Sequence, residues 1–176
     1  LLYNNTIIGA PTNGIAVTGL GNNTVFNNTI VNVGGHGVFA DNRNSSADPS
    51  IGTIPGSFIR VFNNTIVNVG QFGFRTYHEY GPNEFRNNIV INAPSGLVDG
   101  PGVDLASSNN HLSATITGLG FVDVPAHDYR ISGTSIAVDS GVDVSALGVT
   151  FDAENLARPF GAAFDLGAYE TGALSV

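Results

Sequence analysis

The sequence predicts an all-β solenoid built from stacked coils of about 23 residues each. Apolar residues recur at gaps of 23, 36, 23 and 23 residues, at Ile7, Ile30, Ile66, Ile89 and Leu112. An asparagine stands two residues before each of them, at Asn5, Asn28, Asn64, Asn87 and Asn110. The intervening segments are rich in β-branched and aromatic residues and are punctuated by Gly, Pro and Asn, a pattern typical of short strands and turns.

A coil of this length holds about three short strands and three turns. Stacking the coils roughly 4.8 Å apart pairs each strand in parallel with its equivalents in the neighbouring coils. The apolar column then forms a core, and the asparagine column forms a turn ladder whose amides bond to backbone groups. We therefore predict a right-handed parallel β-helix. A leucine-rich repeat has a similar period, but it requires Leu at fixed positions where this chain has Ile, Asn and Gly.

A second apolar column lies eight residues after the first and should also face inward. Its members, each preceded by a glycine (Gly14, Gly37, Gly73 or Gly96), are Ile15, Val38, Phe74 and Leu97. Because side chains alternate along a strand, the next residues should face outward. The first outward row is Ala16, Phe39, Arg75 and Val98, and the second is Thr18, Asp41, Tyr77 and Gly100.

The repeat divides the chain into two parts. Residues 1–112 are expected to form the coils, with the 13 extra residues of one copy in a surface loop at about residues 40–57. Residues 113–176 hold 8 of the 14 acidic residues and are expected to form a final coil or two and an acidic C-terminal cap. Since the chain opens inside a repeat, we expect it to be the C-terminal part of a longer chain.

Composition excludes several classes of partner. The chain has 6 Arg, no Lys and 14 acidic residues, for a net charge of −8. A surface with so few cations does not neutralise phosphates, so nucleic acid is not expected to bind. No apolar run approaches the roughly 18 residues of a membrane span. Cysteine is absent, which excludes disulfides and thiolate metal sites. Low charge with abundant Asn, Gly, Thr and Ser favours a secreted or cell-surface location.

The C-terminal part carries motifs that point to a family. These are His127-Asp-Tyr-Arg-Ile131, Ser135-Ile-Ala-Val-Asp-Ser-Gly141, Phe151-Asp152 with Arg158-Pro159, and Phe164-Asp-Leu-Gly-Ala-Tyr-Glu170. They resemble the closing segment of secreted bacterial β-helix proteins of the pectate-lyase-like superfamily, in the group with variable C-terminal anchors. The resemblance implies an extracellular location but no single activity. It also implies a structural cap network, formed by Asp152, Arg158, Asp165, Tyr169 and Glu170.

The outward rows supply the candidate functional residues. Stacking should bring Phe39 beside Arg75 and Asp41 beside Tyr77. This set of aromatic, guanidinium and carboxylate groups fits either a solvated face with one Asp–Tyr hydrogen bond or a site that binds a glycan. Catalysis at the same place would use Arg75, Tyr77, His78 and Glu79. We interpret His36 as a turn residue. No cofactor is required, and Ca²⁺ is the metal that a set of hard oxygen ligands would suit, namely Glu79, Asp99 and Asp104.

Three functions remain open at the level of the sequence. The leading hypothesis is a secreted or cell-surface structural or adhesive module, with a polysaccharide or another surface glycan as an optional ligand. The second is a polysaccharide lyase or hydrolase acting on acidic glycans. The third is a filament subunit that stacks on itself through an uncapped N-terminal coil, because an open strand edge is a pairing template.

Overall fold

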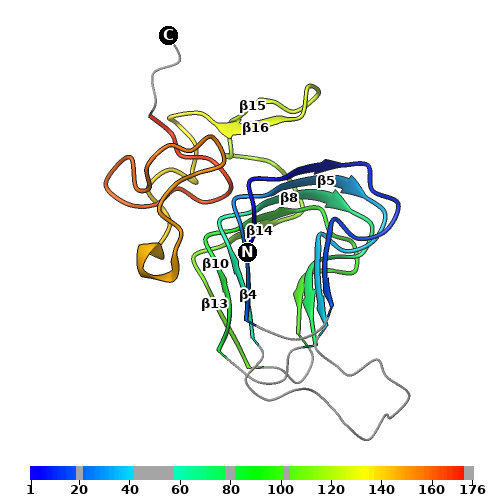
Figure 1. Cartoon of the computed structure of the whole chain (residues 1–176). Helices are drawn as coiled ribbons and strands as arrows, with labels where there is room; N and C mark the ends of the chain where they lie inside the picture. Colours follow the sequence, from blue (N-terminus) through cyan, green and yellow to red (C-terminus); the bar gives the residue numbers. More distant parts are fainter. Residues whose placement is uncertain (19–21, 42–57, 78–81, 101–103, 173–176) are drawn as a thin grey trace, which may run out of the picture.

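The computed structural model describes residues 1–18, 22–41, 58–77, 82–100 and 104–172. Three parallel sheets stack around a common axis, and one antiparallel hairpin lies beside them (Figure 1). Sheet A contains β1 (Leu2–Tyr3), β4 (Asn23–Phe26), β7 (Ile59–Phe62), β10 (Asn83–Arg86) and β13 (Leu105–Ser108). Sheet B contains β2 (Thr6–Ile8), β5 (Thr29–Val33), β8 (Thr65–Val69), β11 (Ile89–Ile91) and β14 (His111–Ser113). Sheet C contains β3 (Ile15–Thr18), β6 (Val38–Asp41), β9 (Phe72–Thr76) and β12 (Gly96–Asp99).

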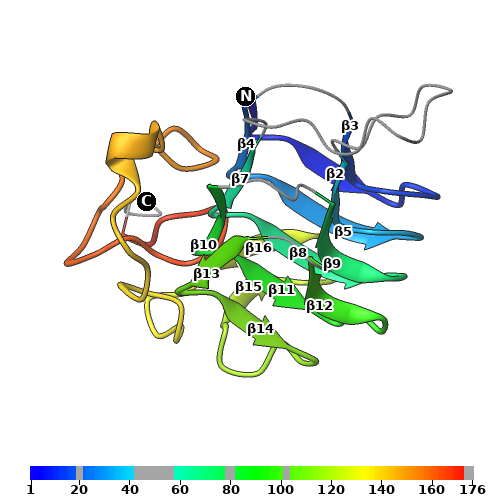
Figure 2. The same ribbon diagram turned by 90° about the horizontal axis from the view of Figure 1, so that it is seen from below.

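Each complete coil contributes one strand to each sheet, and equivalent strands lie in successive layers (Figure 2). Every pairing within sheets A, B and C is parallel, as between β5 and β8, where Ile30 aligns with Ile66. The predicted fold of stacked parallel coils is therefore confirmed. The remaining elements are the hairpin of β15 (Phe121–Asp123) and β16 (Asp128–Ile131), and a short 3₁₀ helix, η2 (Ser145–Leu147).

The register differs from the sequence prediction in one coil. Ile66 aligns with Val90, not with Ile89, and Val90 aligns with Leu112. The ladder asparagine of that coil is correspondingly Asn88 and not Asn87. The prediction was wrong because it assumed a constant period, whereas β7 and β10 are offset by 24 residues and β10 and β13 by 22.

All of this length variation lies in the connections from sheet C to sheet A. From sheet A to sheet C the equivalent residues are always 13 apart, as from Val25 to Val38 and from Phe85 to Val98. The inserted loop belongs to the variable connection, since β6 ends at Asp41 and β7 begins at Ile59. Ala40 and Asp41 therefore belong to a strand, and residues 42–57 of the expected loop lie outside the described residues.

The corner between sheets A and B is built from paired asparagines. The first of each pair has a left-handed backbone, with φ between 50° and 58°, at Asn4, Asn27, Asn63, Asn87 and Asn109. The second forms the predicted ladder: Asn28 donates from its backbone N and from Nδ2 to Oδ1 of Asn64, at 3.0 and 2.9 Å. Asn64 donates to Asn88 in the same way. The asparagine ladder is confirmed, and it satisfies backbone groups where the chain turns.

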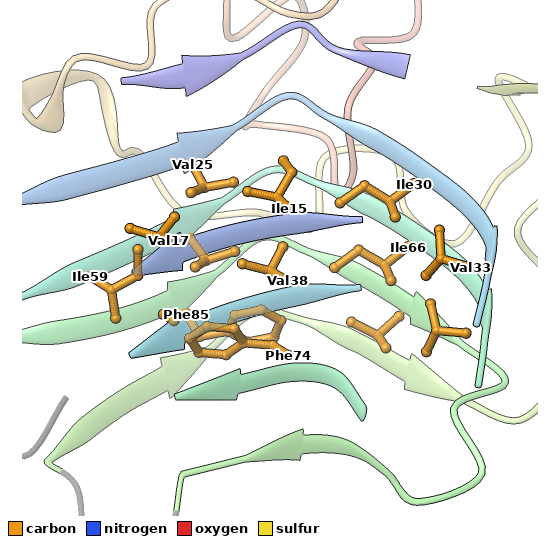
Figure 3. Close-up of a cluster of buried hydrophobic side chains, with 14 residues drawn as sticks. Ile15, Val17, Val25, Ile30, Val33, Val38, Ile59, Ile66, Phe74 and Phe85 are labelled. Atoms are coloured by element: carbon orange, nitrogen blue, oxygen red, sulfur yellow. The ribbon is translucent and has the colours of Figure 1, made fainter. Parts of the chain in front are cut away.

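The interior of the coils is apolar. Figure 3 shows Ile30 and Ile66 one above the other on sheet B, and Phe74 beside Phe85. The two phenylalanine rings stack in parallel with their centroids 5.0 Å apart. Ile30, Ile66, Phe74 and Phe85 are fully buried. Burial of each such side chain stabilises the fold by about 1.5–3 kcal/mol.

The C-terminal part lies along the flank of the coils. Figures 1 and 2 show it beside sheet A, with the β15–β16 hairpin over the outer face of sheet B. The outward side chains Phe26 and Phe62 of sheet A pack against Val144, Val149 and Phe164. On sheet B, a second cluster joins Val31, Val67, Ile89 and Ile91 to Leu119, Tyr129 and Leu166. The apolar surface that this segment buries therefore lies on the sides of sheets A and B.

Candidate functional site

The outer face of sheet C gathers most of the predicted glycan-binding, catalytic and metal-binding residues that the structure describes. Phe39 aligns with Arg75 in the pairing of β6 with β9, as expected. Arg75 then aligns with Asp99 of β12, whereas the prediction had placed Val98 there. Val98 instead aligns with Phe74, so Leu97 is not in the inward column where it was expected. The extra residue before β10 causes this shift and puts a carboxylate beside Arg75.

Four rings form a continuous cluster on this face, which we call the aromatic platform: His36, Phe39, Phe72 and Tyr77. His36 stacks on Phe39 with centroids 5.3 Å apart and planes 19° apart. It also contacts Phe72 at 5.7 Å, and Phe39 meets the edge of Tyr77 at 6.1 Å. All four side chains are half-buried, so part of each remains accessible.

Arg75 lies among these rings and is held by three of its neighbours. Its guanidinium carbon is 4.9 Å from the centroid of Phe72 and 4.8 Å from that of Tyr77. Nε donates to the hydroxyl of Tyr77 at 2.8 Å, and Nη1 pairs with Oδ2 of Asp99 at 3.0 Å. The salt bridge neutralises the guanidinium, and the contacts fix its plane.

His36 occupies the turn before β6, as the sequence indicated, but its ring is part of the platform. Its Nδ1 accepts a hydrogen bond from the backbone N–H of Phe72 at 3.3 Å. Burial lowers the pKa of His36, and the positive charge of Arg75 lowers it further, while Asp99 acts in the opposite direction. An Nδ1 that accepts this hydrogen bond carries no proton, so the bond requires the neutral imidazole with its proton on Nε2. Sequence reasoning missed this role because the spacing of the repeat aligns His36 with the turns of other coils but does not fix the orientation of its ring.

The other candidates are distributed as follows. Asp41 ends β6, where it aligns with Thr18, and Tyr77 follows β9 with its N–H donated to the carbonyl of Ala40 at 2.9 Å. Asp104 is exposed just before β13, and its carbonyl accepts from Nδ2 of Asn83. His78 and Glu79 lie outside the described residues.

The predicted Ca²⁺ site remains a prediction. In the parts of the chain that the structure describes, no three His, Asp or Glu side chains gather in a way that could hold a metal ion. Asp99 is paired with Arg75, and Glu79 is not described. The described residues also contain no helix long and apolar enough to cross a membrane.

The five residues of the predicted cap network lie together in the C-terminal part. Arg158 and Glu170 form an ion pair whose side chains are 0% and 1% exposed. Arg158 also donates from Nη2 to the carbonyl of Gly167 at 2.8 Å. Burial is the main effect on both partners, and it lowers the pKa of Arg158 and raises that of Glu170.

The cap carboxylates accept backbone hydrogen bonds, which indicates a structural role. Oδ1 of Asp152 accepts from the N–H groups of Glu154 and Leu156, both at 2.8 Å. Oδ1 of Asp165 accepts from Asp139 at 2.7 Å. The hydroxyl of Tyr169 accepts from the Thr29 hydroxyl at 3.3 Å and so connects this network to β5.

The left-handed asparagines join the C-terminal part to the coils, a function that the sequence did not reveal. Nδ2 of Asn63 donates to the carbonyl of Asp165 at 2.9 Å, and Nδ2 of Asn27 donates to that of Phe151 at 2.6 Å. Asn87 donates to and accepts from the backbone of Val142. The repeated Asn-Asn doublet therefore has two tasks: the second amide stabilises the corner, and the first binds the flanking segment.

Comparison with known proteins bears on this architecture. The family model described as right-handed beta helix region matches residues 1–118. No curated protein and no solved structure matches the chain. The matched part contains all the strands of sheets A, B and C, which agrees with the predicted right-handed parallel β-helix. Because the match covers 118 of 176 residues, the chain belongs to the right-handed β-helix family.

Proposed function

We propose that this protein is a structural or adhesive module that binds neutral carbohydrate on the outer face of sheet C. Membership of the β-helix family suggests a structural or carbohydrate-related role in general terms. The aromatic platform with Arg75 at its centre is the observation that carries the more specific proposal.

The platform offers the two kinds of group that sugar recognition uses. Aromatic faces pack against the C–H groups of a pyranose ring, and polar groups at the edge bond to its hydroxyls. Phe39 and His36 supply stacked faces, while Arg75, Tyr77 and Asp99 supply donors and acceptors in a fixed arrangement. Since these contacts already hold the side chains in place, binding would order few of them.

Charge favours a neutral ligand over an acidic one. The net charge of the chain is −8, and the positive charge of Arg75 is balanced by Asp99. A polyanionic glycan would meet overall repulsion and would have to compete with Asp99 for the guanidinium. A secreted or cell-surface location, which composition and the C-terminal motifs favour, would bring the platform into contact with such glycans.

A binding measurement with one platform variant tests the proposal. Neutral glycans of different linkages are screened by array and ranked by isothermal titration calorimetry at pH 7.5. Phe39→Ala removes a stacked face and should weaken binding of the best neutral glycan by about tenfold or more, equivalent to about 1.4 kcal/mol. Phe160→Ala, which removes an exposed ring of the C-terminal part, is the matched control and should leave affinity unchanged.

Three results would overturn the proposal. The first is that no neutral glycan binds. The second is equal affinity for the wild type and Phe39→Ala when circular dichroism shows both to be folded. The third is the release of unsaturated or reducing ends from a glycan, abolished by Arg75→Ala, which would replace a binding module with an enzyme.

A further inference from the structure

We infer that His36 is a binding residue of the aromatic platform and that its protonation releases the bound carbohydrate. This inference rests on the proposed function, in which His36 supplies a stacked face, and adds to it a form of regulation. It follows from three features of His36: a ladder bond that only a neutral imidazole can make, the stacking of its ring, and the charges around it.

His36 takes the place of an asparagine in a ladder. In the coil above, Oδ1 of Asn13 accepts from the backbone N–H of His36 at 3.0 Å. Nδ1 of His36 accepts from the backbone N–H of Phe72, in the next coil, at 3.3 Å. The ring nitrogen Nδ1 of His36 therefore accepts the same kind of backbone hydrogen bond as the amide oxygen of Asn13. It differs from that oxygen in one respect, because it can bind a proton within the physiological pH range.

Protonation removes this bond and reverses its polarity. The acceptor Nδ1 becomes a donor, so two N–H groups face each other across the same gap. The N–H of Phe72 then loses its partner, and rotation of the imidazole away from Phe72 relieves the conflict. Such a rotation also breaks the stack with Phe39, whose centroid is 5.3 Å away. The platform loses one of its two stacked faces.

On balance, the charges around His36 also disfavour its protonation. Arg75 from β9 opposes a second positive charge, and Asp99 from β12 attracts it. Asp99 is already paired with Arg75 at 3.0 Å, which limits its attraction for His36. Among the described residues, the other titratable side chains of this face are Tyr77 after β9 and Asp41 at the end of β6. Burial and Arg75 together lower the pKa of His36.

A carbohydrate bound on the platform lowers the pKa of His36 further. It covers the imidazole, removes water from it and disfavours its charged form still more. Ligand and proton therefore compete: lowering the pH through the pKa of His36 weakens binding, and ligand lowers that pKa. Each pH unit by which the ligand lowers the pKa permits up to about a tenfold loss of affinity at low pH.

Affinity measured between pH 8 and pH 5 tests this competition. The wild type should lose affinity for the best neutral glycan by about fivefold to tenfold on acidification. His36→Asn keeps an acceptor for the Phe72 N–H, and His36→Phe keeps a ring. For each variant, the affinity for the glycan should be the same at pH 5 as at pH 8. His111→Asn is the matched control, because burial also lowers the pKa of His111, but this residue lies in β14 of sheet B. This variant should retain the pH dependence of the wild type.

A titration without ligand separates this inference from the proposed function. Nuclear magnetic resonance follows the His36 ring and the Phe72 amide, which should shift together with one midpoint below the ordinary histidine pKa. Constant wild-type affinity across the pH range, or equal pH dependence in His36→Asn, would overturn the inference and leave carbohydrate binding intact. Absence of binding at every pH would overturn the proposed function, and a Phe72 amide insensitive to the His36 titration would overturn the switch itself.

Discussion

At the scale of single residues, buried amides define this β-helix. Asn64 is fully buried, and its Oδ1 accepts from both the backbone N and Nδ2 of Asn28. Its Nδ2 donates to the carbonyls of Val25 and Phe62 and to Oδ1 of Asn88. One side chain thus connects three coils. The repetition of Asn in the sequence predicted this ladder because each copy makes the same local bonds.

Replacing Asn64 should lower the free energy of unfolding substantially. Asn64→Ala leaves the buried backbone N–H of Asn28 without its partner and removes the amide bonds to Val25, Phe62 and Asn88. The free energy of unfolding should therefore fall by about 3 kcal/mol or more. Asn5→Ala removes the same amide from the exposed end of the ladder, where water replaces the lost bonds, and should cost less than about 1 kcal/mol. Urea unfolding monitored by circular dichroism measures both, and equal losses would contradict the argument.

At the scale of strands, close approach of neighbouring coils sets the allowed residues. A Cβ on Gly37 would lie 2.5 Å from the carbonyl oxygen of Gly73 and would collide with the side chain of Ile66. The glycine before each inward residue is therefore a packing requirement in the first three copies. The fourth copy differs, because Leu97 and not Gly96 is the equivalent of Gly73. Among the described residues, no strand of sheet C lies beyond the edge strand β12, so a side chain there meets no neighbouring backbone of this sheet.

A methyl group at this position should strain the stack. Gly37→Ala forces two backbones apart and should lower the free energy of unfolding by about 1–3 kcal/mol. The control Gly133→Ala places its Cβ 3.9 Å from the nearest atom, a methyl carbon of Thr171, and should change stability by less than about 0.5 kcal/mol. Thermal unfolding of the two variants distinguishes these outcomes, and an unchanged midpoint for Gly37→Ala would show that the coils can separate freely.

At the scale of the whole molecule, the C-terminal part completes the coils from the side. It covers apolar residues on sheets A and B that a β-helix would otherwise expose, and it leaves the outer face of sheet C to the aromatic platform. The ion pair of Arg158 with Glu170 lies within this part. It is shielded from water, so its loss should matter more than the loss of a surface pair.

Breaking this pair tests how firmly the C-terminal part is held. Arg158→Met leaves Glu170 buried without its partner and should lower the free energy of unfolding by about 3–5 kcal/mol. Arg130→Met breaks a pair with Asp128 in which the arginine side chain is 47% exposed, and it should cost about 1 kcal/mol or less. Denaturant unfolding compares the two. Similar small losses would mean that the pair contributes little to holding the segment.

The sequence by itself determined the repeated architecture, and the tertiary structure decided where the unrepeated parts lie. Columns such as Ile30 with Ile66 and Asn28 with Asn64 were predictable because each coil makes the same contacts with the next. The placement of Asp99 beside Arg75 was not, since it depends on one extra residue in a connection, and the Asn-Asn doublet fits either alignment. The flanking position of the C-terminal part was decided by packing between segments that share no period. The stacking of His36 on Phe39 was not predictable either, because the repeat fixes which residues align between coils but not how a side chain in a turn is oriented.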